Sequence, residues 1–373
     1  MIQLENLTKI FETPQGVITA ADHISMEVPT GEICVLLGPS GCGKTTTLKM
    51  INRLVTPTSG RVLINGEDTT GIDTVTLRRN IGYVIQQTGL FPNMTIEENI
   101  CLVPKLMGWD AERCKQRAKD LLDMVALDPN TFMKRFPNEL SGGQQQRVGV
   151  IRALAADAPV LLMDEPFGAI DPINRDAIQE EFLKMNKELK KTIMFVSHDI
   201  DEAVKMADKI AIFRGGKLEQ FSSPDRLLAQ PETDFVADFV GSDRTLKRLQ
   251  LATAGEVMET HVPVVTAGET LQEAAKKMEE YGHGMIVKVN KQHQPVGIIT
   301  KEMSLSYRGL CGEHYAGIQA VIKRDEDLRS VVSKMFAYDL SWLPVVDQQG
   351  RLCGEVSQRG ITHHLGAKYQ TKG

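Results

Sequence analysis

The stretch GPSGCGKTTT at residues 38–47 restricts the possible folds of this chain more than any other feature. It matches the pattern G-x-x-x-x-G-K-[ST], in which glycines allow consecutive backbone N–H groups to surround the phosphates of a nucleotide. The apolar segment EICVLLG precedes it, and TTTLKMINRL follows with helical character. A strand, this loop and a helix, in that order, place the anion at the positive end of the helix. The sequence therefore predicts an α/β domain that binds a nucleoside triphosphate.

The residue types of this loop indicate how the phosphates are held. Lys44 is predicted to reach the β- and γ-phosphates, and the Thr45 hydroxyl to bind Mg²⁺. Thr46 supplies a further hydroxyl near the phosphates. The predicted nucleotide-binding residues of the loop are Gly38, Pro39, Ser40, Gly41, Cys42, Gly43, Lys44, Thr45 and Thr46.

Two acidic residues end a second apolar segment, VLLMDE. Four consecutive apolar residues are typical of a central strand in a parallel sheet, where both faces are buried. Asp164 is predicted to hold the hydration shell of the metal ion. Glu165 is predicted to be catalytic and to polarise a water molecule against the γ-phosphate.

A second anion site is predicted at LSGGQQQR, residues 140–147. The Ser141 hydroxyl and the N–H groups of Gly142 and Gly143 open a helix there. One domain has little use for two such sites around one triphosphate, whereas a homodimer can place one from each copy on the same nucleotide.

With these motifs, residues 1–240 resemble the ATP-binding subunit of an ABC transporter, whose signature is LSGGQ. The resemblance implies that Phe11 stacks on adenine and that Gln86 contacts Mg²⁺ and the attacking water. It also implies that Asp171 lies in the D-loop and that His198, in TIMFVSHD, is a catalytic histidine reaching the γ-phosphate. The dimer of this family is head to tail, so each ATP lies between the phosphate loop of one copy and LSGGQ of the other.

Composition limits the remaining possibilities. The formal net charge is −5 and the pI is near 6.0, which gives no indication of a nucleic-acid-binding surface. Six cysteines are scattered without a C-x-x-C pair, as in proteins of a reducing cytoplasm. No apolar run approaches the ~18 residues of a membrane span, so we expect other chains to supply any membrane part.

From about residue 255 onward the sequence repeats itself at an offset of 57 residues. Met278 corresponds to Met335, and Gly297 to Gly354. Each copy is predicted to contain a strand, an amphipathic helix and two further strands, which gives an α+β pair after the α/β ATPase domain. The predicted divisions are an ATPase domain at 1–240, a linker at 241–254, repeats at 255–309 and 310–366, and a tail at 367–373.

The repeats resemble a tandem pair of CBS domains, a regulatory module that in many proteins binds adenosine compounds. Adenosine-binding versions place an aspartate three residues after a Thr or Ser, where it contacts the ribose. Here Met303 and Gly360 occupy those positions, so AMP and ATP are expected to bind weakly or not at all. Three interpretations stay open for the pair: a sensor of ionic strength, a site for another regulatory ligand such as a cyclic dinucleotide, and a packing or dimerisation module.

This architecture resembles the energising subunits of importers for the osmoprotectants glycine betaine, carnitine and choline. The implied partners are an integral membrane permease and a substrate-binding protein, and the implied location is peripheral, on the cytoplasmic face of the inner membrane. Binding a quaternary ammonium generally requires an aromatic cage, and with Trp109 and Trp342 as the only tryptophans the cage is expected in the partner. The alternatives are an importer for another small solute and a non-transport ABC ATPase acting on nucleic acid or ribosomes. A third alternative makes residues 255–366 the functional centre, as a ligand sensor.

Overall fold

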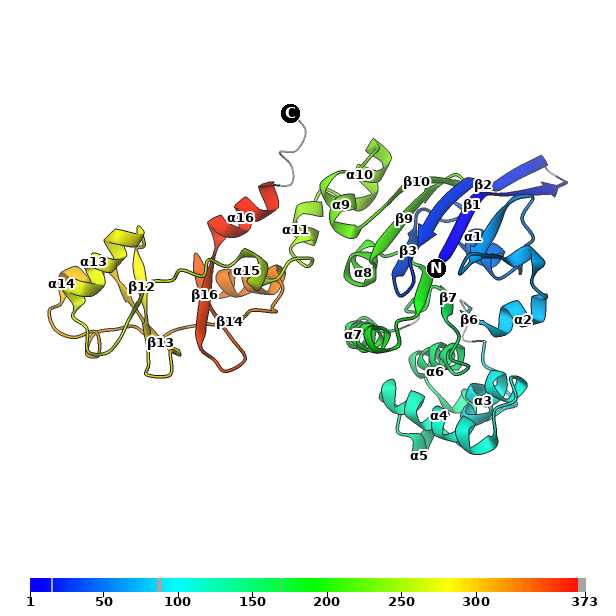
Figure 1. Ribbon diagram of the computed structural model, residues 1–373, viewed down its shortest axis with the longest axis horizontal. Coiled ribbons are helices and arrows are strands. Elements are labelled where there is room, and N and C mark those ends of the chain that lie inside the picture. The colour runs from blue at the N-terminus through cyan, green and yellow to red at the C-terminus, as the bar shows by residue number, and fades with distance from the viewer. Residues whose placement is uncertain (15, 86–88, 169, 368–373) are drawn as a thin grey trace. The chain divides into compact units, whose positions relative to one another are not determined.

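The computed structural model describes residues 1–14, 16–85, 89–168 and 170–367 of the chain. These divide into two compact units, Met1–Gly241 and Ser242–Gly373 (Figure 1). The first contains the phosphate loop and both acidic residues, and the second contains the sequence repeat.

The first unit is organised around a sheet of six described strands in the order β10-β9-β3-β8-β7-β6. Neighbouring strands are parallel except for β9 and β10. β3, β7 and β8 are buried along their whole length, as the apolar segments in the sequence predicted. Because the strands are parallel, the segments that follow β3, β6, β7 and β8 leave the sheet at the same edge. The strands are β3 Ile33–Leu37, β6 Ile81–Val84, β7 Val160–Asp164, β8 Thr192–Val196, β9 Lys209–Arg214 and β10 Lys217–Ser222.

A second sheet of four described strands is antiparallel, in the order β2-β1-β4-β5. The alternating pattern predicted its first two strands, and the residues that alternate inward, such as Ile2 and Leu4, join one core with Leu36 of β3 and Leu48. This core places the second sheet over the helix that follows the phosphate loop. The strands are β1 Ile2–Thr13, β2 Gly16–Val28, β4 Ser59–Ile64 and β5 Glu67–Asp68.

Helix α1, Lys44–Ile51, follows the phosphate loop and is shorter than the sequence pattern predicted. The pattern continues to Leu54, but Arg53 has a φ of 48°, which a right-handed helix does not allow. Asn52 therefore ends the helix. The remaining helices of the unit are α2 Thr74–Arg79, α3 Ile96–Leu106, α4 Ala111–Met124, α5 Pro129–Phe132, α6 Gly142–Leu154, α7 Pro172–Leu189, α8 Ile200–Met206, α9 Pro224–Ala229 and α10 Asp234–Val240.

Helices α3, α4, α5 and α6 gather in a helical lobe on one side of this unit (Figure 1). Asn99 on α3 is fully buried and fixes the segment that enters the lobe. Its amide donates to the carbonyls of Phe91, Met94 and Thr95 at 3.0 to 3.1 Å and accepts from the N–H of Phe91 at 2.8 Å. The N-terminus of α6 carries the LSGGQ sequence, so the lobe presents that motif.

The second unit consists of two similar halves, each with a three-stranded sheet among its described residues. The predicted offset of 57 residues relates β12 to β15, β13 to β16, and the start of α13 to that of α15. The first half contains β11 Val264–Val265, α13 Leu271–Tyr281, β12 Met285–Val289, β13 Pro295–Thr300 and α14 Lys301–Ser306. The second contains β14 Ile322–Lys323, α15 Leu328–Ala337, β15 Trp342–Val346, β16 Leu352–Ser357 and α16 Gln358–Ala367.

The segment predicted as a linker is packed within this second unit. It forms α11, Arg244–Arg248, and is followed by α12, Ala254–Val257. The Arg248 side chain is 2 % exposed and donates to the Leu365 carbonyl at 3.0 Å. Leu249 and Ala252 lie in the core of the second half. No helix within the described ranges is both long enough and apolar enough to cross a membrane.

Candidate functional site

The phosphate loop follows β3 and requires glycine at two positions. Gly38 has a φ of 144°, and a Cβ atom there would lie 2.2 Å from the Phe213 carbonyl oxygen. Gly43 has a φ of 103°, and a Cβ atom there would lie 2.0 Å from the Ala20 carbonyl oxygen. Both distances are far below van der Waals contact, and both φ values favour glycine. The two glycines of the motif are therefore fixed by the packing of the loop against β2 and β9.

The Lys44 side chain lies against the inner side of this loop. Its side chain is 5 % exposed, and its Nζ donates to the carbonyls of Gly38 at 2.7 Å and Pro39 at 2.9 Å. The Cys42 sulfur is 3.6 Å from the same nitrogen. Ser40 and Gly41, at the tip of the loop, are exposed. The buried ammonium group of Lys44 therefore lies against a loop whose tip is open to a ligand.

Thr45 and Asp164 bring two oxygen atoms together at the sheet edge. The Thr45 hydroxyl, on the first turn of α1, donates to Asp164 Oδ1 at 3.0 Å. Asp164 ends β7 and is 4 % exposed. Burial raises the pKa of its carboxyl, and the hydrogen bond from Thr45 opposes that rise. A hydroxyl and a carboxylate are hard oxygen ligands of the kind that Mg²⁺ takes, usually together with water and substrate phosphates.

Glu165 and His198 are paired beside this position. His198 Nε2 lies 2.8 Å from Glu165 Oε1. Glu165 has a φ of 51°, an unusual conformation for a residue other than glycine, and its N–H donates to the Val196 carbonyl at 3.1 Å. This backbone turn ends β7 and directs the carboxylate toward the segment that follows β8. Two elements distant in sequence thus supply the carboxylate and the imidazole.

The N-terminus of α6 is open to a ligand. Ser141 is its N-cap: Ser141 Oγ accepts from the N–H of Gln144 at 3.4 Å, and Gln144 Oε1 accepts from the N–H of Ser141 at 3.0 Å. A Cβ atom built on Gly142 or Gly143 would meet nothing within 4 Å. Gly142 and Gly143 therefore have open space beside their backbone, next to the exposed Ser141, at the positive end of a 13-residue helix.

The other predicted site residues are placed as follows. Phe11 lies on β1, is 37 % exposed, and has Lys9 Nζ 4.9 Å from its ring centroid. Thr46 is half-buried on α1, and Asp171 is exposed just before α7. Gln86 lies outside the described residues.

Two buried side chains beside the site were not predicted from the sequence. Gln146 on α6 is 4 % exposed, and its Nε2 donates to the carbonyls of Glu165, at 3.2 Å, and Pro166. Glu202 on α8 is 8 % exposed and accepts from Gln179 Nε2 at 2.8 Å. Both are polar residues on otherwise apolar helix faces, which is the only signal that the sequence contains for them.

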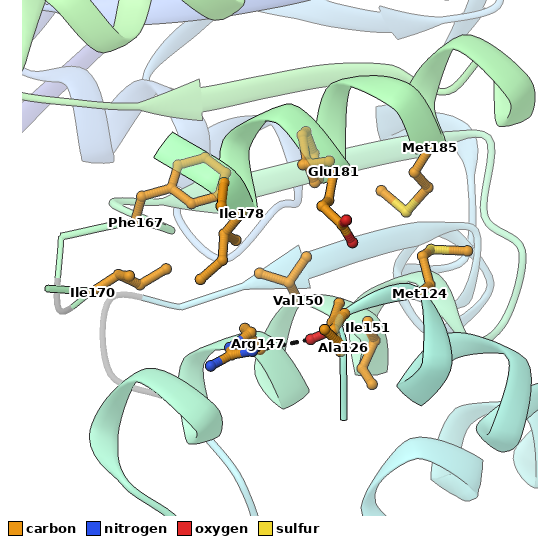
Figure 2. A pocket seen from close by; sticks show the side chains of 13 residues that line it. Met124, Ala126, Arg147, Val150, Ile151, Phe167, Ile170, Ile178, Glu181 and Met185 are labelled. Atoms are coloured by element: carbon orange, nitrogen blue, oxygen red, sulfur yellow. Dashed lines mark hydrogen bonds between the residues drawn. The ribbon is translucent and has the colours of Figure 1, made fainter. Parts of the chain in front are cut away.

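An apolar pocket of about 180 Å³ lies between α6 and α7, close to the loop after β7 (Figure 2). Figure 2 shows α6 on one side of it and α7 on the other, and residues from the end of α4 close it. The pocket leaves these two helices incompletely packed against each other. Its lining includes Met124, Arg147, Val150, Ile170, Ile178 and Met185.

In the second unit, the two positions predicted to lack a ribose-binding aspartate have structural roles. Met303 packs against the core of the first half, and its N–H donates to Thr300 Oγ1 at 3.2 Å. The N–H of Gly360 donates to Ser357 Oγ at 3.0 Å. A wide cleft of about 660 Å³ lies beside Ser357 and Gly360. Its charged and titratable lining residues are Glu256, Glu259, Arg359, His363 and His364.

A parallel sheet in which β3 leads through a phosphate loop into a helix, and in which β7, separated from β3 by β8, ends in a pair of carboxylates, defines a P-loop nucleotide-binding ATPase. Comparison with known families narrows this class. Residues 21–168 match the ABC transporter family, and residues 254–302 and 320–367 match the CBS domain.

Two relatives are similar to the chain along nearly its whole length. The osmoprotectant import ATP-binding protein OsmV of Salmonella typhimurium is 56 % identical over 368 residues, which is 98 % of this chain and 96 % of the relative. The glycine betaine/carnitine/choline transport ATP-binding protein OpuCA of Bacillus subtilis is 44 % identical over 365 residues, 97 % of this chain and 95 % of the relative. The chain therefore belongs to the family of ABC transporter ATP-binding proteins that carry CBS domains.

Solved structures agree with this assignment. A dimeric bacterial ABC transporter cassette, MJ0796, has a TM-score of 0.56 and 36 % identity, covering 60 % of this chain and 98 % of that one. The same cassette in a post-hydrolysis state bound to ADP and Pi has a TM-score of 0.56 and 35 % identity, with the same coverage. The predicted fold class, an ABC ATPase domain followed by a tandem CBS pair, is confirmed, and the chain is an ATP-binding ATPase subunit.

Proposed function

We propose that this chain hydrolyses ATP to energise the import of quaternary-amine osmoprotectants through a partner permease. The observation that carries the catalytic part is the meeting of two pairs at one sheet edge: Thr45 with Asp164 at 3.0 Å, and Glu165 with His198 at 2.8 Å. The substrate class is supported by the similarity of the whole chain, CBS repeats included, to importers whose names state osmoprotectants. The proposal includes a location at the cytoplasmic face of the inner membrane, with a permease and a substrate-binding protein as partners.

In this proposal the phosphate loop binds the triphosphate through its N–H groups and Lys44, and Phe11 stacks on the adenine. Thr45 and Asp164, with Gln86, would hold Mg²⁺, which would supply positive charge to offset that of the β- and γ-phosphates. Glu165 accepts a proton from the attacking water, and His198 orients that water and the γ-phosphate.

The open N-terminus of α6 supplies the other half of the site. In a head-to-tail homodimer, Ser141, Gly142 and Gly143 of one copy donate to the γ-phosphate bound by the phosphate loop of the other. ATP then joins the two copies because two positive helix ends share one triphosphate, and hydrolysis releases them. The dimeric structure of the similar cassette supports the formation of a dimer.

A direct test is the variant Glu165→Gln, which keeps the shape of the side chain but removes the base. We expect it to bind ATP, to hydrolyse it at least about 100-fold more slowly, and to elute as a dimer when ATP is present. Size-exclusion chromatography with and without ATP measures this. The double variant Lys44→Ala/Glu165→Gln is the control, because it should lose ATP binding and stay monomeric. Hydrolysis near the wild-type rate by Glu165→Gln would contradict the assigned role.

The substrate class is tested separately. The chain is purified with its permease and binding protein, reconstituted in vesicles, and assayed for ATP-driven uptake of glycine betaine, carnitine and choline, with a polyamine for comparison. Uptake of the polyamine alone would favour the alternative, an importer for another small solute.

A further inference from the structure

We propose that Glu202 is a positioning residue for His198, and that it holds the loop after β8 in the geometry that hydrolysis requires. The proposal rests on the proposed function, in which His198 acts beside Glu165 on the γ-phosphate. Glu202 lies in the first turn of α8 and is 8 % exposed. Burying a carboxylate this deeply costs free energy unless hydrogen bonds replace those it made with water. The hydrogen-bond partners of Glu202 therefore indicate which parts of the chain it holds in place.

The first partner of Glu202 is Ser197, the residue before His198. The Ser197 hydroxyl donates to Glu202 Oε2 and accepts from the N–H of Asp199 at 3.0 Å. The N–H of Ser197 in turn donates to the Leu36 carbonyl of β3 at 3.1 Å. One chain of hydrogen bonds therefore fixes the residues on both sides of His198.

The His198 ring has little packing of its own to hold it. Its side chain is 49 % exposed, and its Nε2 lies 2.8 Å from Glu165 Oε1. The position of the imidazole consequently depends on the backbone of residues 197–199, which Glu202 controls through Ser197.

The second partner of Glu202 lies on α7. Gln179, 3 % exposed, donates to Glu202 Oε1 at 2.8 Å. One turn earlier, Arg175 Nη2 donates to the Ile170 carbonyl at 3.0 Å, and Arg175 Nη1 lies 3.9 Å from Asp199 Oδ2. Helix α7 is thus attached to the start of α8 at two points. Glu202 is one of these two points, and it joins α7 to Ser197, the residue before His198.

Both partners are donors, so a carboxylate, which can accept a hydrogen bond at each of its two oxygens, suits this position. Burial raises the pKa of Glu202 above its ordinary value, and the hydrogen bonds from Ser197 and Gln179 oppose that rise. An amide in its place would present a donor where an acceptor is needed. Alanine would leave the Gln179 amide and the Ser197 hydroxyl without this acceptor.

The test uses Glu202→Ala and Glu202→Gln in the full chain, with Asp201→Asn as the matched control. Asp201 is the preceding carboxylate on α8, and it is exposed. We expect kcat for MgATP hydrolysis to fall about tenfold to 100-fold for Glu202→Ala, as a small displacement of a catalytic group can produce, and less for Glu202→Gln. The Kd for ATP should change less than about twofold in both, because the phosphate loop is intact. Asp201→Asn should keep the wild-type kcat.

A double-mutant cycle separates positioning from general destabilisation. In single-turnover assays with His198→Ala, adding Glu202→Ala should lower the rate by less than about twofold, because the group that Glu202 positions is already absent. If Glu202→Ala lowers the rate by the same factor with and without His198, or if both Glu202 variants keep wild-type kcat while His198→Ala is inactive, the inference is wrong and the proposed function stands. If His198→Ala itself hydrolyses ATP normally, the assigned role of His198 in the proposed function is wrong. Should Glu202→Ala fail to bind ATP, the cycle is run with Glu202→Gln.

Discussion

At the scale of single residues, Cys42 shows how little free space the phosphate loop contains. Its side chain is 4 % exposed, its sulfur is 3.6 Å from Lys44 Nζ, and a Cβ atom on Gly38 would lie 2.8 Å from it. Because this sulfur is buried against Gly38 and Lys44, a bulky group attached to it does not fit while the loop keeps this conformation.

We therefore predict that a maleimide inactivates the ATPase by reacting with Cys42 when the loop opens, and that bound ATP protects it by keeping the loop closed. Alkylation of each cysteine is followed by mass spectrometry against hydrolysis of the same samples. Cys353, half-buried in the other unit, is the internal control and should react at the same rate with and without ATP. The variant Cys42→Ala, compared with its own untreated activity, should be insensitive. Equal alkylation of Cys42 in both conditions would refute the prediction.

At the scale of elements, the helical lobe and the sheet edge are joined by Gln146. The pocket between α6 and α7 reduces their direct packing, whereas Gln146 reaches from α6 to the carbonyls of Glu165 and Pro166. Ser141 caps the N-terminus of α6, and Glu165 is the proposed base. The Gln146 amide therefore connects, within a single copy, the helix that presents the LSGGQ sequence to the turn that presents the base.

Replacing Gln146 by leucine keeps the side-chain volume nearly constant but leaves two carbonyls without this donor, which should reduce stability by about 1–3 kcal/mol. We expect kcat to fall by about tenfold or more and the affinity for ATP to stay the same. The control is Arg117→Met, which removes a 3.1 Å bond to the Leu154 carbonyl at the other end of α6. It should lower the melting temperature and leave kcat unchanged. An equal loss of kcat in both variants would mean that stability of the lobe, not the Gln146 contact, is what turnover needs.

The residues that meet at this sheet edge could be found from the sequence because each belongs to a short contiguous pattern. Lys44 and Thr45 follow one apolar segment and Asp164 follows another, and parallel strands bring such ends together. Gln146 and Glu202 could not be found in this way, because their roles depend on hydrogen-bond partners about 20 residues away in the sequence, Glu165 and Gln179. The residues at 241–254 were interpreted as a linker, and the sequence does not show that Arg248 among them is buried and donates to the Leu365 carbonyl, 117 residues later.

At the scale of the whole molecule, the chain joins an ATPase unit ending at Gly241 to a CBS unit that hydrolysis itself does not require in the proposed mechanism. The CBS repeats hold 14 acidic and 12 basic residues between positions 255 and 366. Several of these form ion pairs on the surface, including Lys276 with Glu280 at 3.8 Å and Arg351 with Asp347 at 2.8 Å. Such a surface of mixed charge is suited to contacts that respond to salt.

We predict that the CBS unit holds the transporter in a less active state through exposed ion pairs with its surroundings, and that rising ionic strength releases it. Raising salt from about 0.15 M to 1 M shortens the Debye length from about 8 Å to about 3 Å. Each exposed pair contributes less than about 1 kcal/mol, so losing two or three changes a balanced equilibrium by about tenfold.

Transport in reconstituted vesicles is measured across internal salt concentrations for the full chain and for a chain ended after Gly241. The shortened chain should hydrolyse ATP, which also verifies that it folds, and should transport at the activated rate at every salt concentration. Sucrose at matched osmolality is the control for osmotic pressure and should not activate the full chain. If the shortened chain keeps the salt response, the sensor lies elsewhere and the CBS unit is an assembly module.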